Sequence, residues 1–199
     1  MAVDMIDVAF ALEGRALPPE YRYALAEALE SALPWLRAEP ASGVHPLNLV
    51  RSGDEALVSP RTRLVLRVPR AREQDAGALA GAELRLGPHA VRVTQPHPRE
   101  LLAHGTLYAH LVAAEETQEE DFLVRMRGEL DALGVRAQPV CGRWQSTESG
   151  RLAGCSLMLS GLAAEQSLRV LERGLGAHRR LGCGLFVPHK SAAAVGAPD

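Results

Sequence analysis

Apolar and polar positions alternate along the first half of the chain with periods that predict strands and helices. Leucines repeat every three or four residues after Pro18-Pro19, which is typical of one face of an amphipathic helix. Between 62 and 68, apolar residues alternate with arginines, which is typical of a strand with one core face and one wet, basic face. The predicted elements are a strand at 5–12, that helix, strands at 44–50 and 62–68, a short helix at 69–80, and a strand or a hairpin bent at Gly87-Pro88 over 84–93. The predicted order is β-α-β-β-α-β.

The same order of elements starts again after a proline-rich stretch at 95–98. A capping-box sequence from Thr117 to Glu120 opens a helix whose apolar stripe stops at Gly134. The predicted elements of this half are a strand at 106–113, that helix, strands at 135–144 and 152–159, a helix at 162–173 and a strand at 183–187. We therefore expect an α+β fold of two tandem ferredoxin-like, or RRM-like, units. The expected boundaries are an N-terminal domain at 1–95, a linker at 96–104, a C-terminal domain at 105–190 and a disordered tail at 191–199.

Composition narrows the classes of ligand that the chain is expected to bind. The 199 residues carry a formal net charge of −2, so a site for a polyanion must come from local clusters of bases. Three cysteines without CxxC spacing argue against disulfides and a structural zinc site, and no acids and histidines have the spacing of a metal site. We therefore expect no metal and no cofactor. Neither a signal peptide nor a long apolar run is present, which indicates a cytoplasmic protein without a membrane partner.

The most distinctive motif is a doubled Gly-x-Gly around a basic centre, from Gly174 to Gly184. Its glycines allow close approach of the backbone to a ligand, and its basic centre indicates a ligand rich in phosphate. A helix is expected before this loop and a strand after it, whereas P-loops and dinucleotide-binding loops run from strand to helix. The order therefore excludes both nucleotide-binding folds. The alternative is a glycine-rich turn that joins a helix to an edge strand.

Basic residues and histidines offer further candidates for binding and catalysis. Between 61 and 72 the chain has five arginines and no acid, and this cluster could face an RNA backbone or be an ordinary solvated surface. His45 follows the first predicted helix, and a histidine there could act as a general base. Lys190, the only lysine, comes just after the glycine loop, where its compact charge could stabilise a phosphorane.

Taken together, these segments resemble one protein family. The run from Gly174 to Lys190 closely resembles the C-terminal glycine-rich motif of the CRISPR-associated repeat-RNA endoribonucleases, the Cas-six family of the RAMP superfamily, and is most similar to the subtype labelled MYXAN. Other matching segments are Leu17-Pro18, Tyr23 to Ala26, Ala32 to Leu36, Gly43 to His45, Arg61 to Arg67 and Cys141 to Arg143. The resemblance covers the chain from Ile6 to Lys190.

The resemblance implies a metal-independent endoribonuclease that cleaves precursor CRISPR RNA within its repeats and often retains the guide RNA. In the family's chemistry, the ribose 2′-hydroxyl attacks the adjacent phosphate and gives 2′,3′-cyclic phosphate and 5′-hydroxyl ends. His45 matches the position of the family's general base, and Tyr23 and Lys190 are its expected catalytic partners. The glycine loop is expected to hold the repeat RNA through backbone N–H groups. The expected RNA-binding residues are Arg61, Arg63, Arg67, Arg143, Gly174, Gly176, His178, Arg179, Arg180, Gly182 and Gly184.

Two other functions fit the same residues. A non-catalytic subunit could hold processed guide RNA among the other subunits of a CRISPR surveillance complex, and only His45 and its neighbours would distinguish it from the enzyme. A tandem ferredoxin-like regulatory domain could bind a small metabolite and use the glycines as a turn. Salt dependence separates this last function, because RNA binding through several phosphates weakens steeply with salt.

Overall fold

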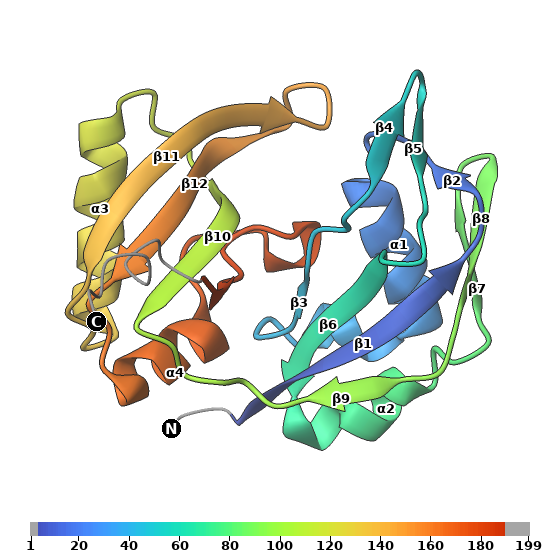
Figure 1. The fold of residues 1–199 in the computed structure, drawn as a ribbon, viewed down its shortest axis with the longest axis horizontal. Coiled ribbons are helices and arrows are strands. Elements are labelled where there is room, and N and C mark those ends of the chain that lie inside the picture. The colour runs from blue at the N-terminus through green and yellow to red at the C-terminus, as the bar shows by residue number, and fades with distance from the viewer. Residues whose placement is uncertain (1–3, 190–199) are drawn as a thin grey trace, which may run out of the picture.

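Each of the two predicted units forms its own main sheet and its own core, and these two sheets lie side by side in the molecule (Figure 1); the N-terminal unit also contains a small three-stranded sheet. The structure is a computed structural model, and it describes residues 4–189. The N-terminal unit consists of β1 (Met5–Glu13), β2 (Ala16–Leu17), α1 (Arg22–Ala32), β3 (Gly43–Val44), β4 (Val50–Ser52), β5 (Glu55–Leu57), β6 (Arg63–Pro69), α2 (Glu73–Gly77), β7 (Glu83–Leu86), β8 (His89–Val93) and β9 (His97–Arg99). Short 3-10 helices follow α1 at Pro34–Ala38 and precede α2 at Arg70–Arg72.

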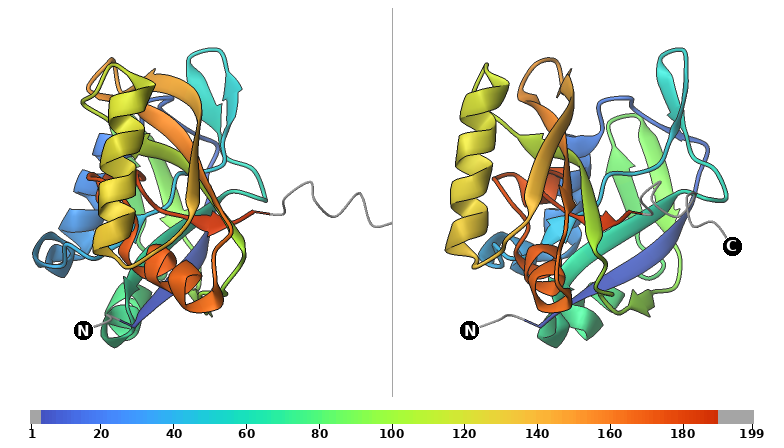
Figure 2. Two further views of the ribbon diagram at one scale, coloured as in Figure 1. Left: turned by 90° about the vertical axis from the view of Figure 1, so that its left-hand side faces the viewer. Right: turned by 60° about the vertical axis from the view of Figure 1, so that its left-hand side comes forward.

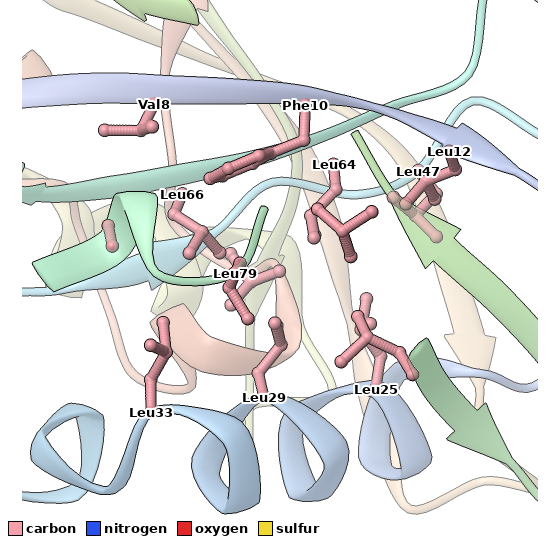
Figure 3. Packing of buried hydrophobic residues seen from close by; sticks show 14 of the residues in the cluster. Val8, Phe10, Leu12, Leu25, Leu29, Leu33, Leu47, Leu64, Leu66 and Leu79 are labelled. Carbon is pink, nitrogen blue, oxygen red and sulfur yellow. The ribbon is translucent and has the colours of Figure 1, made fainter. Parts of the chain in front are cut away.

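The N-terminal sheet has the strand order β3-β6-β1-β8-β7, and β9 also pairs with β1. All of these pairs are antiparallel. Figure 3 shows how α1 covers one face of the sheet: Leu25 and Leu29 of the helix, and Leu33 directly after it, point toward Leu64, Leu66 and Leu79. The other face of β1 and β6 is therefore free to meet the C-terminal unit.

The last strand of the N-terminal unit differs from the prediction. Residues 84–93 form the β7–β8 hairpin, the second of the two forms expected for that stretch, and β8 pairs with β1 only at Leu12 and Glu13. The strand that lies along the middle of β1 is β9, which pairs with Asp7, Val8 and Ala9. The stretch expected to be a linker thus contains a strand of the first sheet. Likewise, only Gly43–Val44 of the strand expected at 44–50 pairs with β6.

The C-terminal unit follows the predicted order of elements closely. It consists of β10 (Thr106–Ala113), α3 (Glu119–Ala132), β11 (Gln138–Thr147), β12 (Leu152–Ser160), α4 (Ala164–Arg173), the 3-10 turn η3 (Arg179–Leu181) and β13 (Val187–Pro188). The sheet order is β11-β12-β10-β13, again fully antiparallel. The strand predicted at 183–187 is shorter and begins only at Val187.

Helices α3 and α4 cover the outer face of the C-terminal sheet, as both views of Figure 2 show. Phe122, Met126 and Val170 from these helices pack against Leu107 and Leu157 of the sheet. The inner face of this sheet therefore remains open toward the N-terminal unit. Among residues 4–189, no helix is long and apolar enough to span a membrane.

Candidate active site

His45 lies where the two units meet. It directly follows β3, and its backbone N–H donates a hydrogen bond to the carbonyl of Val65 at 2.9 Å, which extends the pairing of β3 with β6. Gly182 of the glycine loop packs against the backbone on either side of His45. A Cβ at Gly182 would lie 3.2 Å from the carbonyl oxygen of Val44 and 3.3 Å from the nitrogen of Pro46. The glycine loop and the candidate base are thus direct neighbours.

An aspartate of the central strand faces the imidazole of His45. Nε2 of His45 lies 3.6 Å from Oδ1 of Asp7, and both side chains are mostly buried. Nε2 has no hydrogen-bond partner among the described residues. Burial lowers the pKa of His45, and this effect outweighs the opposing influence of Asp7. A buried imidazole that is neutral near pH 7 and borders a carboxylate has the properties of a general base.

Asp7 is held in place by Arg67. The Arg67 guanidinium donates from Nε to Oδ1 at 2.8 Å and from Nη2 to Oδ2 at 2.9 Å, which is the bidentate geometry of a strong ion pair. Burial by itself would raise the pKa of Asp7, but the contacts with His45 and Arg67 lower it well below its usual range. Asp7 therefore stays ionised beside His45.

The expectation that Arg67 contacts RNA is wrong. Its side chain is 1% exposed, and its Nη1 donates to the carbonyls of Leu171 at 2.8 Å and Phe186 at 2.9 Å in the C-terminal unit. The side of β6 that was expected to be wet is covered there by the second unit. Arg67 therefore joins the two units instead of facing a ligand.

The glycine loop also differs from the expectation that its glycine N–H groups hold RNA. All four of these groups donate within the protein: Gly174 to the carbonyl of Val170, Gly176 to a carboxylate oxygen of Glu129, Gly182 to the carbonyl of Arg179 and Gly184 to the carbonyl of Leu111. At Gly184, with φ of 66°, a Cβ would collide with the carbonyl of Leu175. The glycines therefore allow tight packing of the loop, and they have no free amide to offer a phosphate.

The basic centre of the loop is divided between an inward and an outward arginine. Arg179 donates to the carbonyls of Glu172 and Arg173 at the end of α4, and burial lowers its pKa to about 10. Arg180 is 39% exposed and forms an ion pair with Glu30 of α1 at 2.6 Å. His178 is exposed, in a left-handed conformation. Of the two arginines, Arg180 is the one that is placed to meet an incoming phosphate.

The structure separates Tyr23 from His45. Tyr23 lines a cavity of about 450 Å³ with Arg179 and Arg180, and the guanidinium of Arg151 lies 4.0 Å from the centre of its ring. His45 lines a different, small pocket with Tyr21, Arg22 and Gly182. The expected catalytic residue Lys190 lies outside the described residues.

A groove of about 880 Å³ runs between the two units beside this small pocket. Its basic lining residues are Arg22, Arg51 and Arg143, and no acidic residue is among those that line it. Tyr21 and Arg22 border both the groove and the pocket of His45. Arg61 is exposed and Arg63 is half-buried at the start of β6. An acid-free, arginine-lined groove that reaches a candidate base is suited to a polyanion such as RNA.

Comparison with known proteins decides the family. The sequence profile of the family described as Cas6 Crispr matches residues 6–191. The chain belongs to the Cas6 CRISPR family. It is similar to a protein of Myxococcus xanthus (strain DK1622) named CRISPR-associated endonuclease Cas6, with 33% identity over 193 residues, which are 96% of this chain and 84% of that one. The expected family is thereby confirmed.

Solved structures show the same fold. One is a CRISPR associated protein Cas6, with a TM-score of 0.65 and 11% identity, covering 94% of this chain and 100% of that one. Another is described as a RAMP protein binding different RNA substrates, with a TM-score of 0.62 and 15% identity, covering 91% of this chain and 98% of that one. The expected tandem ferredoxin-like fold is confirmed.

Sequence reasoning missed three residues of this candidate site: Asp7, Tyr21 and Arg22. Asp7 is the one acid in the apolar run from Met5 to Leu12, and a charge inside a buried strand is a signal that could have been followed. Tyr21 and Arg22 carry no such signal, because only the fold brings the start of α1 to the glycine loop. The described residues contain no group of three or more His, Cys, Asp or Glu side chains that could hold a metal ion.

Proposed function

We propose that this Cas6 protein is a metal-independent endoribonuclease that cleaves precursor CRISPR RNA within its repeats and retains the guide RNA. The observation that carries the proposal is the buried His45–Asp7 pair beside the glycine loop, at the edge of an acid-free groove. The Myxococcus xanthus relative is named an endonuclease, which supports the same activity here. Other subunits of a CRISPR effector complex are proposed partners.

The proposed chemistry needs one base and no external nucleophile. Asp7 favours the tautomer of His45 that carries its proton on Nε2, which leaves Nδ1 to accept a proton. Nδ1 takes the proton of the ribose 2′-hydroxyl, and the oxygen attacks the adjacent phosphorus. The bond from phosphorus to the 5′-oxygen breaks, and that oxygen takes a proton from solvent water and leaves as a 5′-hydroxyl. The proton held on Nδ1 of His45 returns to solvent, which restores the neutral imidazole. The other product is a 2′,3′-cyclic phosphate, and the half-buried Arg180, which lines the pocket of His45, would bind the phosphate during the reaction.

Cleavage of repeat RNA in EDTA tests the proposal. We expect the wild-type protein to cut the RNA of the CRISPR repeat encoded beside its gene once. His45→Ala should bind the same RNA but cut it about 10²- to 10⁴-fold more slowly, which is the usual contribution of a general base. His97→Ala is the matched control, since His97 is an exposed histidine of β9 outside the site. Single-turnover rates and a filter-binding assay measure the two effects separately.

Three outcomes would contradict the proposal. Full cleavage by His45→Ala would move the base elsewhere in the chain. A requirement for Mg²⁺ would exclude the metal-independent mechanism. Tight binding without cleavage by the wild-type protein would instead assign the chain as a non-catalytic guide-RNA-binding subunit.

A further inference from the structure

Two β-bulges lie side by side on the C-terminal sheet. Strand β10 has one extra residue between Ala109 and Val112, and β11 has one between Cys141 and Trp144. On β12 both irregularities span the same short segment, from Cys155 to Leu157. Bulges of this kind redirect side chains and are frequent beside binding sites. Because both bulges lie opposite the same three residues of β12, they change the direction of the side chains at one position across the sheet.

Side chains satisfy the backbone groups that the bulges release from the ladder. The hydroxyl of Ser156 accepts a hydrogen bond from the backbone N–H of Arg143 at 3.1 Å. The side-chain amide of Gln145 donates to the carbonyl of His110 at 2.5 Å. Both bulges are therefore held by specific partners, and they fix the positions of Arg143 and His110.

The bulged segment presents an aromatic and basic surface to the groove. Tyr108 and His110 both lie on the open face of β10, with ring centres 5.0 Å apart and ring planes at 82°. The ring of His189 lies 5.5 Å from that of Tyr108. Tyr108, His110 and Arg143 line the groove together with Arg22 and Arg51, and the lining holds no acid. Aromatic rings beside arginines, with no negative charge nearby, are what a nucleotide requires.

We propose that this face, formed by Tyr108, His110 and Arg143, binds one unpaired nucleotide of the RNA. The base stacks on the ring of Tyr108 with the ring of His110 beside it, and Arg143 binds its phosphate. The nucleotide must be unpaired, because only an unstacked base has a face free for an aromatic ring. The proposal rests on the proposed function only for the identity of the RNA.

Fluorescence of an aminopurine base in a short unstructured RNA tests the stacking directly, without cleavage. On wild-type protein we expect the fluorescence to be quenched when the base stacks. Tyr108→Ala should abolish the quenching and weaken binding about tenfold, whereas Tyr108→Phe, which keeps the ring, should bind within about twofold of wild type. Arg143→Ala should reduce the slope of log affinity against log salt concentration by about 1, which corresponds to the loss of one phosphate contact. Arg127→Ala is the matched control, because Arg127 is exposed on α3, which covers the opposite face of the same sheet.

The outcomes separate this site from the proposed function. If Tyr108→Ala quenches and binds like wild type, or if wild-type protein neither binds nor quenches the short RNA, the stacking site is refuted, whatever the cleavage assay shows. If quenching depends on Tyr108 but the wild-type protein cuts no repeat RNA, the stacking site stands and the nuclease proposal fails. Thermal melting of Tyr108→Ala checks that any loss of binding comes from a folded protein.

Discussion

His45 is kept neutral by its surroundings, and this determines how cleavage should depend on pH. Burial lowers its pKa most, the nearby charges of Arg67 and Arg179 lower it further, and Asp7 opposes them. A general base works in its neutral form, so a lowered pKa extends activity toward acid. We expect the acidic limb of single-turnover cleavage to lie below pH 6.5, the ordinary value for histidine.

Replacing the carboxylate of Asp7 is a second test of how the surrounding charges shift the pKa of His45. Asp7→Asn removes an influence that raises the pKa of His45, so the acidic limb should move to still lower pH. A limb at or above pH 6.5 in the wild-type protein, or a shift toward neutral pH in the variant, would contradict the arrangement of charges around His45.

Single residues also show which parts of the site could be predicted from the sequence and which depend on the fold. The position of His45 after the first helix could be predicted because it is a local property of the chain, whereas its role as the base stays a prediction from the family resemblance. Arg63 and Arg67 could not be told apart, since alternation shows which residues share a face but not what covers that face. The second unit covers Arg67 and leaves Arg63 half-buried, and this is a property of the assembled fold.

At the scale of elements, the tip of the β11–β12 hairpin caps helix α1. Glu148 is 1% exposed, and its Oε1 accepts a hydrogen bond from the backbone N–H of Arg22 at 3.1 Å. The helix has no side-chain cap of its own at Tyr21. We expect Glu148→Ala to lower the free energy of unfolding by about 1 kcal/mol, the usual effect of losing a cap, as measured by urea denaturation. Glu148→Gln keeps a side-chain oxygen that can accept this hydrogen bond, so it should lower the free energy of unfolding by less.

An acid elsewhere on the same helix provides the control for this prediction. Glu27 is exposed on α1, and Glu27→Ala should change stability by no more than about 0.5 kcal/mol. Equal losses in Glu27→Ala and Glu148→Ala would show that the hairpin contributes nothing specific to the helix.

The strands of the N-terminal unit show why some elements escaped prediction. β9 has three exposed residues and a proline, so it carries neither an apolar alternation nor a strand-like composition. The β7–β8 hairpin has the alternation, because Leu84, Leu86 and Val91 are buried in the core. The alternation of apolar residues shows which residues are buried, but it does not show which strand pairs with β1. In the C-terminal unit β10 and β12 are both mostly buried and paired with each other, so there the periodicity also predicts the pairing.

At the scale of the whole molecule, a few polar contacts join the two units beside the groove. Arg22 donates to the carbonyl of Leu181 at 2.5 Å, and Arg180 pairs with Glu30. Arg67 makes the most buried of these contacts, as it bonds Asp7 in one unit and two carbonyls in the other. The position of the base and the junction of the units thus depend on the same guanidinium.

Arg67 and Arg63, on one face of the same strand, should therefore respond to substitution in opposite ways. Arg67→Ala leaves Asp7 without its partner and should lower the free energy of unfolding by about 3–5 kcal/mol, the usual result of breaking a buried pair. Arg67→Lys keeps the charge but cannot make all four hydrogen bonds, so its loss should be intermediate. Arg63→Ala should alter the free energy of unfolding by no more than about 0.5 kcal/mol.

For RNA binding the order of the two arginines reverses. Arg63→Ala should reduce the slope of log affinity against log salt concentration by about 1, which corresponds to one lost phosphate contact. Arg67→Lys should leave this slope unchanged. A reduced slope in Arg67→Lys, with wild-type stability, would mean that this guanidinium faces RNA and not the junction between the units.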